Sequence, residues 1–192
     1  YFAGQPQAQL IVRVHPEELR GAGHPSVEIV RGALPELPAH VVVVPPDSKI
    51  NTYDLVELAH VGLVYTTTVG MEMAMQGVPV IVAGRTHYRQ RGFTEDPATM
   101  DEFLAVLDRL VHRPLGSRLE QSRVETAWQY AYRFFFEFPF AFPWHLIGFW
   151  DDLAERPLET VVRPDVLPRY APALEALRGR PIDWAASHDP GE

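Results

Sequence analysis

Four short apolar runs, separated by helix-like segments, constrain the fold of this chain more than any other feature. The runs are residues 9–14, 40–44, 61–65 and 78–83, and valine is their commonest residue. Continuous apolar runs of this length are typical of parallel strands that are buried on both faces. Strands that alternate with helices favour right-handed crossovers. We therefore predict an α/β fold in which the four runs lie adjacent in one Rossmann-like parallel sheet, with helices on both faces.

Capping residues predict where the helices between these strands begin and end. Ser26 can cap one helix, and Asn51 or Thr52 can cap the helix that leads to the third strand. Gly77 is suited to end a helix over 69–76, because glycine readily takes the left-handed conformation that follows many helices. Each of the first three predicted strands is thus followed by a helix with its own start or stop signal.

The sequence changes character after the fourth strand. Thr99 and Glu102 form a capping box that predicts a helix, and Ser117 with Glu120 forms a second box, which predicts a long helix over 117–138. We therefore divide the chain into a Rossmann-like domain and a helical, aromatic-rich extension with a loose tail. The first part covers residues 1–112 and the second covers 113–192.

Composition excludes several classes of function. The chain has 192 residues, a net charge of -8 and no cysteine. A duplex-binding surface needs a basic excess, so we expect no nucleic-acid partner. Disulfides and thiolate metal sites are ruled out, and the histidines show no metal-ligand spacing such as HExxH. We expect no metal and no cofactor. No apolar run is long enough to span a membrane.

The stretch from residue 65 to residue 74 is the strongest candidate for a ligand site. A hydroxyl-rich turn of Thr66, Thr67 and Thr68 joins the third strand to a helix, and Gly70 and Glu72 follow in its first turn. Helix amides, hydroxyls and a glycine can hold a phosphate, and a carboxylate can accept from sugar hydroxyls. The alternative is structural, because threonine caps helices and a first-turn glutamate suits the helix dipole.

Other strand ends carry polar groups as well. Arg13 and His15 end the first strand, and we interpret them as phosphate contacts. Asn51, Arg85 and Tyr88 are weaker candidates. Asn51 can instead be a plain helix cap, and the loop that holds Arg85 and Tyr88 can instead be a solvated loop. If the strands are parallel, all of these groups end at one edge of the sheet.

These residues resemble the capsule polysaccharide biosynthesis proteins, a family of GT-B glycosyltransferases, some of which transfer Kdo from CMP-Kdo. The similarity covers about residues 8 to 110. Its motifs are Arg13-Val-His15-Pro16, Asp54-Leu55, Tyr65-Thr-Thr-Thr-Val-Gly70-Met-Glu72-Met-Ala74, Gly77-Val-Pro79-Val-Ile-Val-Ala-Gly84, Tyr88 and Gly92-Phe-Thr94.

The resemblance implies the C-terminal, donor-binding half of a GT-B fold. In it, His15 would contact the donor phosphate, Thr66 to Thr68 and Gly70 would hold phosphate, and Glu72 would take the ribose. The turn has threonines where the family often has serines. The acceptor domain, which supplies the catalytic base in such enzymes, has no counterpart in these residues, so the catalytic residues are not identified.

Partners and location follow from the same resemblance. It implies a nucleotide-sugar donor, a saccharide or glycolipid acceptor, and a cytoplasmic protein; peripheral association of the full-length protein with the inner face of the membrane is left open. We expect the chain to be the C-terminal part of a longer protein, which binds a nucleotide by itself without turnover. An apolar patch is then expected to be exposed here and covered in the parent, at Phe140, Phe142, Trp144 and Trp150.

Two other functions remain open at this point. A nucleotide-sugar epimerase of the same architecture would need acid and base groups across a cleft, and Asp47, Glu72 and Asp96 are the candidates. A non-catalytic module of a capsule assembly or export complex would use the fold as a binding platform. The identity of the sugar, the base and the acceptor leaves no signature in the sequence.

Overall fold

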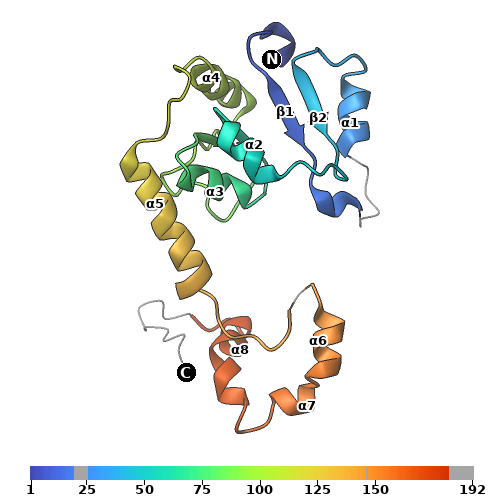
Figure 1. Ribbon diagram of the computed structural model, residues 1–192. Helices are drawn as coiled ribbons and strands as arrows, with labels where there is room; N and C mark the ends of the chain where they lie inside the picture. The colour runs from blue at the N-terminus through green and yellow to red at the C-terminus, as the bar shows by residue number, and fades with distance from the viewer. Residues whose placement is uncertain (20–25, 146, 182–192) are drawn as a thin grey trace. The chain divides into compact units, whose positions relative to one another are not determined.

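The computed structural model describes residues 1–19, 26–145 and 147–181. The chain forms two compact units, Tyr1–Trp128 and Gln129–Glu192, and each is described separately. Among its described residues, the first unit contains four strands and five α-helices, the last of which continues along the chain into the second unit (Figure 1). The elements are β1 (Leu10–Arg13), α1 (Ser26–Ala33), β2 (Val41–Val44), α2 (Thr52–Leu58), β3 (Gly62–Val64), α3 (Val69–Met75), β4 (Val80–Val82), α4 (Met100–Val111) and α5 (Gln121–Tyr132).

The strands are parallel, as predicted, but they pair as two separate sheets. β1 pairs with β2, with Leu10 opposite Val41, and β3 pairs with β4, with Gly62 opposite Val80. The outer edge of β4 is occupied by Glu95, whose amide and carbonyl bond to the β4 backbone at 2.8 and 2.9 Å. The prediction of one four-stranded sheet is therefore wrong for the described residues. The strands are only three or four residues long, so each pair has few backbone groups with which to bond a further strand.

Helices do cover both faces of the β3–β4 pair. Met73 of α3 lies beside Gly62 and Val80, where a Cβ at position 62 would come within 2.6 Å of its sulfur. The next residue along β4, Ile81, is fully buried against Leu107 and Leu110 of α4. Successive strand side chains point to opposite faces of a sheet, so α3 and α4 lie on opposite faces. This arrangement confirms the α/β layering, although over two strands rather than four.

Most of the predicted caps are present. Asn51 Oδ1 accepts from the amide of Tyr53 at 2.9 Å, and Thr99 Oγ1 accepts from the amide of Glu102 at 3.2 Å. Gly77 has a φ of +78°, the left-handed conformation expected after α3. The box at Ser117 is wrong: its hydroxyl donates to the carbonyl of Pro114, and α5 begins only at residue 121. The proline bends the chain back toward the serine, so the hydroxyl is used in a turn.

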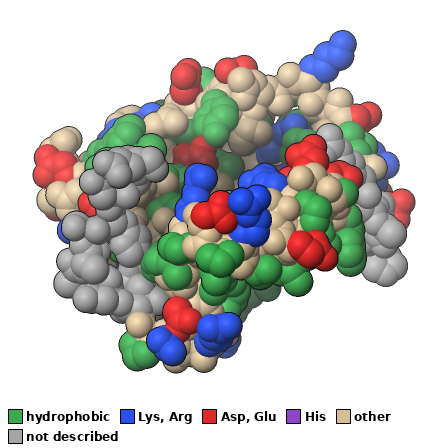
Figure 2. Space-filling view, turned by 90° about the horizontal axis from the view of Figure 1, so that it is seen from below, with side chains coloured by type: hydrophobic (Ala, Val, Ile, Leu, Met, Phe, Trp, Pro, Cys, Tyr) green, Lys and Arg blue, Asp and Glu red, His purple; other side chains and the backbone are tan. Residues whose placement is uncertain are grey.

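The second unit is helical. α5 continues into a π-helix, Arg133–Glu137, and α6 (Phe149–Glu155), α7 (Leu158–Val161) and α8 (Ala171–Leu177) follow. Several aromatic side chains here are exposed, including Phe142 at 40% and Trp150 at 78%. Phe140 and Trp144 are half-buried, so part of the predicted patch is exposed in this chain. Figure 2 shows hydrophobic side chains interspersed with acidic and basic ones on the face in view.

Candidate functional site

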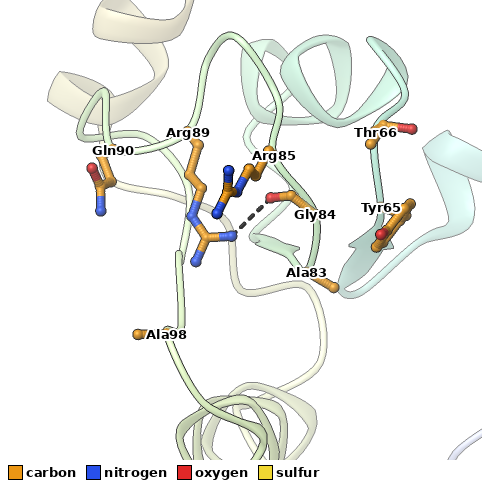
Figure 3. Close-up of a pocket in the computed structure, with 8 residues that line it drawn as sticks. All are labelled: Tyr65, Thr66, Ala83, Gly84, Arg85, Arg89, Gln90 and Ala98. Atoms are coloured by element: carbon orange, nitrogen blue, oxygen red, sulfur yellow. Dashed lines mark hydrogen bonds between the residues drawn. The ribbon is translucent and has the colours of Figure 1, made fainter.

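A cavity of about 590 Å³ opens where β3 and β4 end. Tyr65 and Thr66 follow β3, and Ala83, Gly84 and Arg85 follow β4. The loop beyond β4 supplies the remaining lining residues, Arg89, Gln90 and Ala98 (Figure 3). The cavity therefore lies at the carboxyl edge of a parallel strand pair, the position at which open α/β sheets usually bind ligands.

The two strand ends approach each other closely because position 84 has no side chain. A Cβ on Gly84 would collide with the carbonyl oxygen of Tyr65 and lie 3.1 Å from the methyl carbon of Thr66. The methyl group of Thr66 thus faces Gly84, and Figure 3 shows its hydroxyl turned away from the arginines. In this rotamer the Thr66 hydroxyl contributes no donor to the middle of the cavity.

The two arginines of the cavity have different surroundings. Arg89 Nη1 donates to the carbonyl of Gly84 at 2.7 Å, and its Nη2 donates to the carbonyls of Asp96 and Pro97 at 3.2 and 2.5 Å. Arg89 therefore ties the two ends of the loop together. Arg85 is exposed, and no described residue forms a hydrogen bond or an ion pair with it. Figure 3 shows both arginines among the residues that line the cavity.

Further bonds fix the loop that carries these arginines. The carboxylate of Asp96 accepts from the amide of Gln90 at 3.0 Å and from the hydroxyl of Thr94 at 2.9 Å. Gln90 has a φ of +60°, and the bond to its amide helps to hold that uncommon conformation. Glu95 forms ion pairs with Arg109 of α4 and Arg123 of α5 at 2.8 and 3.0 Å. The loop is thus bound to two helices as well as to β4.

The hydroxyl-rich turn is held by internal bonds. The hydroxyl of buried Tyr88 donates to the carbonyl of Thr67 at 2.6 Å, and burial raises the pKa of Tyr88 to about 12. Thr67 Oγ1 accepts from the amide of Val69 at 3.3 Å, and the carbonyl of Thr68 accepts from the amide of Met71 at 2.9 Å. Two of the first amides of α3 are therefore already bonded, which weakens the interpretation of this helix end as a phosphate site.

Gly70 is buried for a reason internal to the fold. A Cβ at this position would collide with the hydroxyl oxygen of Tyr88 and approach the Val64 side chain to 2.9 Å. The sequence interpretation assigned the absent Cβ to the approach of a ligand. In the structure the space is filled by the tyrosine, so Gly70 and Tyr88 both serve to support the turn.

Glu72 has a partner that the sequence reasoning missed. Its Oε2 accepts a hydrogen bond of 2.6 Å from the hydroxyl of Tyr53, on α2. The hydrogen bond to the Glu72 carboxylate, together with its charge, raises the pKa of Tyr53. Asn51, a weaker ligand candidate, caps α2 and thereby fixes the backbone of Tyr53. Tyr53 is the second residue of α2, and the sequence gave no separate signal for a role at that position.

Arg13 and His15 lie at the end of β1 and make local contacts. Arg13 Nη1 donates to the carbonyls of Val14 and Pro45 at 2.8 and 2.7 Å, so the side chain joins the ends of β1 and β2. His15 is exposed, and its Nδ1 accepts from the amide of Glu17 at 3.1 Å. Neither residue lines the cavity.

The structure thus gathers only part of the predicted set at the cavity. Thr66 and Arg85 line it, whereas the other candidates, Arg13, His15, Asn51, Thr67, Thr68, Gly70, Glu72 and Tyr88, do not. Arg89 and Gln90 were missed as lining residues. The sequence feature that could have indicated them is the arginine-rich loop that suggested Arg85. Only the fold shows which side chains of that loop line the cavity.

The described residues contain neither a metal-binding cluster nor a membrane-spanning helix. In residues 1–19, 26–145 and 147–181, no group of three or more histidine or acidic side chains is placed to hold a metal ion. Within these same ranges, no helix has the length and apolar character needed to cross a membrane.

Comparison with known proteins assigns the chain to a family. Neither the curated proteins nor the solved structures gave a match. The family model described as capsule polysaccharide biosynthesis protein matches residues 2–118, which include all four strands, the cavity and the turn after β3. This span exceeds half of the 192 residues. The chain therefore belongs to the family of capsule polysaccharide biosynthesis proteins.

Proposed function

We propose that this chain is the donor-binding part of a glycosyltransferase that acts in the synthesis of a capsular or surface polysaccharide. The family assignment supports a role in capsule synthesis. The observation that carries the finer proposal is the cavity at the carboxyl ends of β3 and β4, which lies inside the family-matched span and contains Arg85 and Arg89. A nucleotide sugar presents phosphate charge, and a cationic cavity at a strand edge suits such a ligand.

The proposed chemistry is stabilisation of the leaving nucleotide. Glycosyl transfer from a nucleotide sugar breaks the bond between the anomeric carbon and a phosphate oxygen, and negative charge develops on that oxygen. A cation fixed beside the phosphate stabilises this charge more in the transition state than in the ground state, which lowers the barrier. The acceptor and the base that deprotonates it are assigned to the rest of the full-length protein. CMP-Kdo is one candidate donor.

Binding is the first test. Isothermal titration calorimetry of this chain with CMP, UDP and the corresponding nucleotide sugars should show saturable binding to one site. Arg85→Gln should weaken it, whereas Arg31→Gln, which changes an exposed arginine on α1, should leave it unchanged. Absence of binding by all these ligands would exclude the donor-site proposal.

Product analysis of the full-length protein separates the three functional classes. Mass spectrometry with isotope-labelled CMP- and UDP-sugars and a capsule-type acceptor should show the labelled sugar on the acceptor and free nucleotide. An epimerase would isomerise the nucleotide sugar without an acceptor, and an assembly module would leave it unchanged. The isolated chain is expected to bind the donor without transfer.

The structure gives no support to the epimerase candidates as an acid–base pair. The carboxylate of Asp96 is bonded to Gln90 and Thr94, and that of Glu72 is bonded to Tyr53. Asp47 is exposed in the segment after β2. Among these carboxylates, none lines the cavity, so the transferase remains the proposal.

A further inference from the structure

The cavity contains one arginine that is used by the fold and one that is not. Arg89 donates to three backbone carbonyls, Gly84, Asp96 and Pro97, which accounts for its structural role. Arg85 stands directly after the cavity-forming glycine, is exposed, and forms no hydrogen bond or ion pair with a described residue. Its five N–H donors are therefore available to a ligand.

The charge balance of the cavity favours an anion. Arg89 donates to carbonyl oxygens, which leave its charge in place, and Arg85 lines the same cavity (Figure 3). The loop also carries two acidic groups: the Asp96 carboxylate is bonded to the Gln90 amide and the Thr94 hydroxyl, and Glu95 is paired with Arg109 and Arg123. Two guanidinium groups that line one cavity repel each other, and an oxyanion bound in that cavity lowers the repulsion energy.

Hydrogen bonds and ion pairs hold the loop that carries Arg85 in place. Arg89 closes the loop between Gly84 and Pro97, and the Glu95 ion pairs attach the loop to α4 and α5. A side chain on a fixed backbone loses less entropy when it binds a ligand than one on a mobile loop, so more of the interaction energy remains as affinity. Guanidinium is also the group whose planar fork matches two oxygens of one phosphate.

We propose that Arg85 is the main phosphate-binding side chain of this site, with Arg89 as a fixed second charge. The inference rests on the proposed function and deepens it. It assigns recognition of the nucleotide phosphate to the loop after β4. The proposal does not assign this role to His15, which does not line the cavity and whose Nδ1 accepts from the amide of Glu17. Nor does it assign the role to the first amides of α3, because those of Val69 and Met71 are bonded within the protein.

Calorimetry with matched ligands tests the assignment. CMP and UDP should bind the unmodified chain, and Arg85→Gln should weaken both by roughly ten-fold or more, because a charge-assisted hydrogen bond is lost. Cytidine and uridine have no phosphate, so any binding of these nucleosides should be the same in both proteins. Arg85→Lys should lie between the two, because it keeps the charge but loses the fork. Arg31→Gln is the control, and circular dichroism checks the fold of each variant.

Four other results would each be decisive. If Arg85→Gln leaves CMP and UDP binding unchanged while His15→Ala weakens it, the inference is wrong and the donor-site proposal survives. Equal weakening of nucleotide and nucleoside binding would also refute it, because Arg85 would then act on the site as a whole. If the unmodified chain binds inorganic phosphate through Arg85 but no nucleotide, the phosphate site is real and the proposed function fails. If it binds neither, both fail.

Discussion

Gly70 and Tyr88 pack against each other so closely that position 70 has no space for a side chain. The hydroxyl oxygen of Tyr88 occupies the volume that a Cβ would need, and the same hydroxyl donates to the carbonyl of Thr67 at 2.6 Å. A residue of the loop after β4 therefore holds the turn after β3 in place. Since this loop also carries Arg85 and Arg89, the turn and the cavity share one support.

Gly70→Ala should reduce the free energy of unfolding by roughly 1–3 kcal/mol, because the new methyl group overpacks a buried site. Tyr88→Phe removes the oxygen that the methyl group would meet, and the cost of Gly70→Ala should be smaller in that background. Urea denaturation of the two single variants and the double variant measures the coupling. Purely additive costs would show that Tyr88 is not the residue that excludes a side chain at position 70.

The Tyr53–Glu72 bond predicts a shift in titration. Donation to the Glu72 carboxylate raises the pKa of Tyr53 above its ordinary value of 10.0. The neutral hydroxyl is favoured in the folded state, so the bond stabilises the fold below pH 10.0 and is lost as the pH rises through the folded pKa. Glu72→Gln should lower the pKa of Tyr53 toward 10.0.

Ultraviolet absorbance of the phenolate, taken as the difference between each protein and its Tyr53→Phe counterpart, isolates this residue from the other tyrosines. Glu57→Gln, on the exposed face of α2, is the control. The same Tyr53 titration in the Glu72→Gln variant and in the unmodified chain would mean that the bond does not persist in solution.

Glu95 should make stability depend on acid. Burial raises the pKa of its carboxyl, but the hydrogen bonds and charges of Arg123 and Arg109 outweigh this and hold the pKa below its ordinary value of 4.5. Ionised Glu95 therefore stabilises the fold above pH 4.5, and this contribution disappears as the pH falls through the folded pKa. Glu95→Gln should cost roughly 1.5–3 kcal/mol at neutral pH.

Urea denaturation at several values between neutral pH and about pH 3 tests this dependence, because linkage requires the difference between the two proteins to shrink on acidification. Glu36→Gln, which changes an exposed glutamate that forms no ion pair with a described residue, serves as the control. A difference that stays constant with pH would assign the effect of Glu95→Gln to packing rather than to charge.

The family resemblance predicts that Glu72, although it does not line the cavity, accepts from hydroxyls of the donor's sugar. One carboxylate oxygen is bonded to Tyr53, and Oε1 has no hydrogen bond recorded with a described residue. Glu72→Ala should weaken nucleotide-sugar binding by roughly 1.5–3 kcal/mol through loss of a charge-assisted hydrogen bond. Calorimetry measures this, with Glu57→Ala as the matched control. Unchanged affinity in a folded variant would leave Glu72 with the Tyr53 bond and the helix dipole as its roles.

Local signals predicted much of the secondary structure. Valine-rich runs gave strands, because β-branched side chains suit a half-buried pleated surface, and Asn51, Thr99 and Gly77 marked helix ends through bonds or backbone angles that depend on near neighbours. The predicted cap at Ser117 is wrong, because its hydroxyl donates to the carbonyl of Pro114 instead. The division of the four strands into two separate pairs was also missed, because strand pairing depends on contacts between segments that lie far apart in sequence.

The sequence by itself determined the class of fold, the parallel direction of the strands, and the family, because these depend on patterns within short segments. Only the tertiary structure decided which candidates share a site. Gly84 and the carbonyls that hold Arg89 turn one loop toward the ends of β3 and β4, which places Arg85 in the cavity. Gly70 and Tyr88 instead pack against each other inside the protein. A side chain can bind a ligand only if the fold leaves its donors unbonded, and that balance is set by neighbours that are distant along the chain.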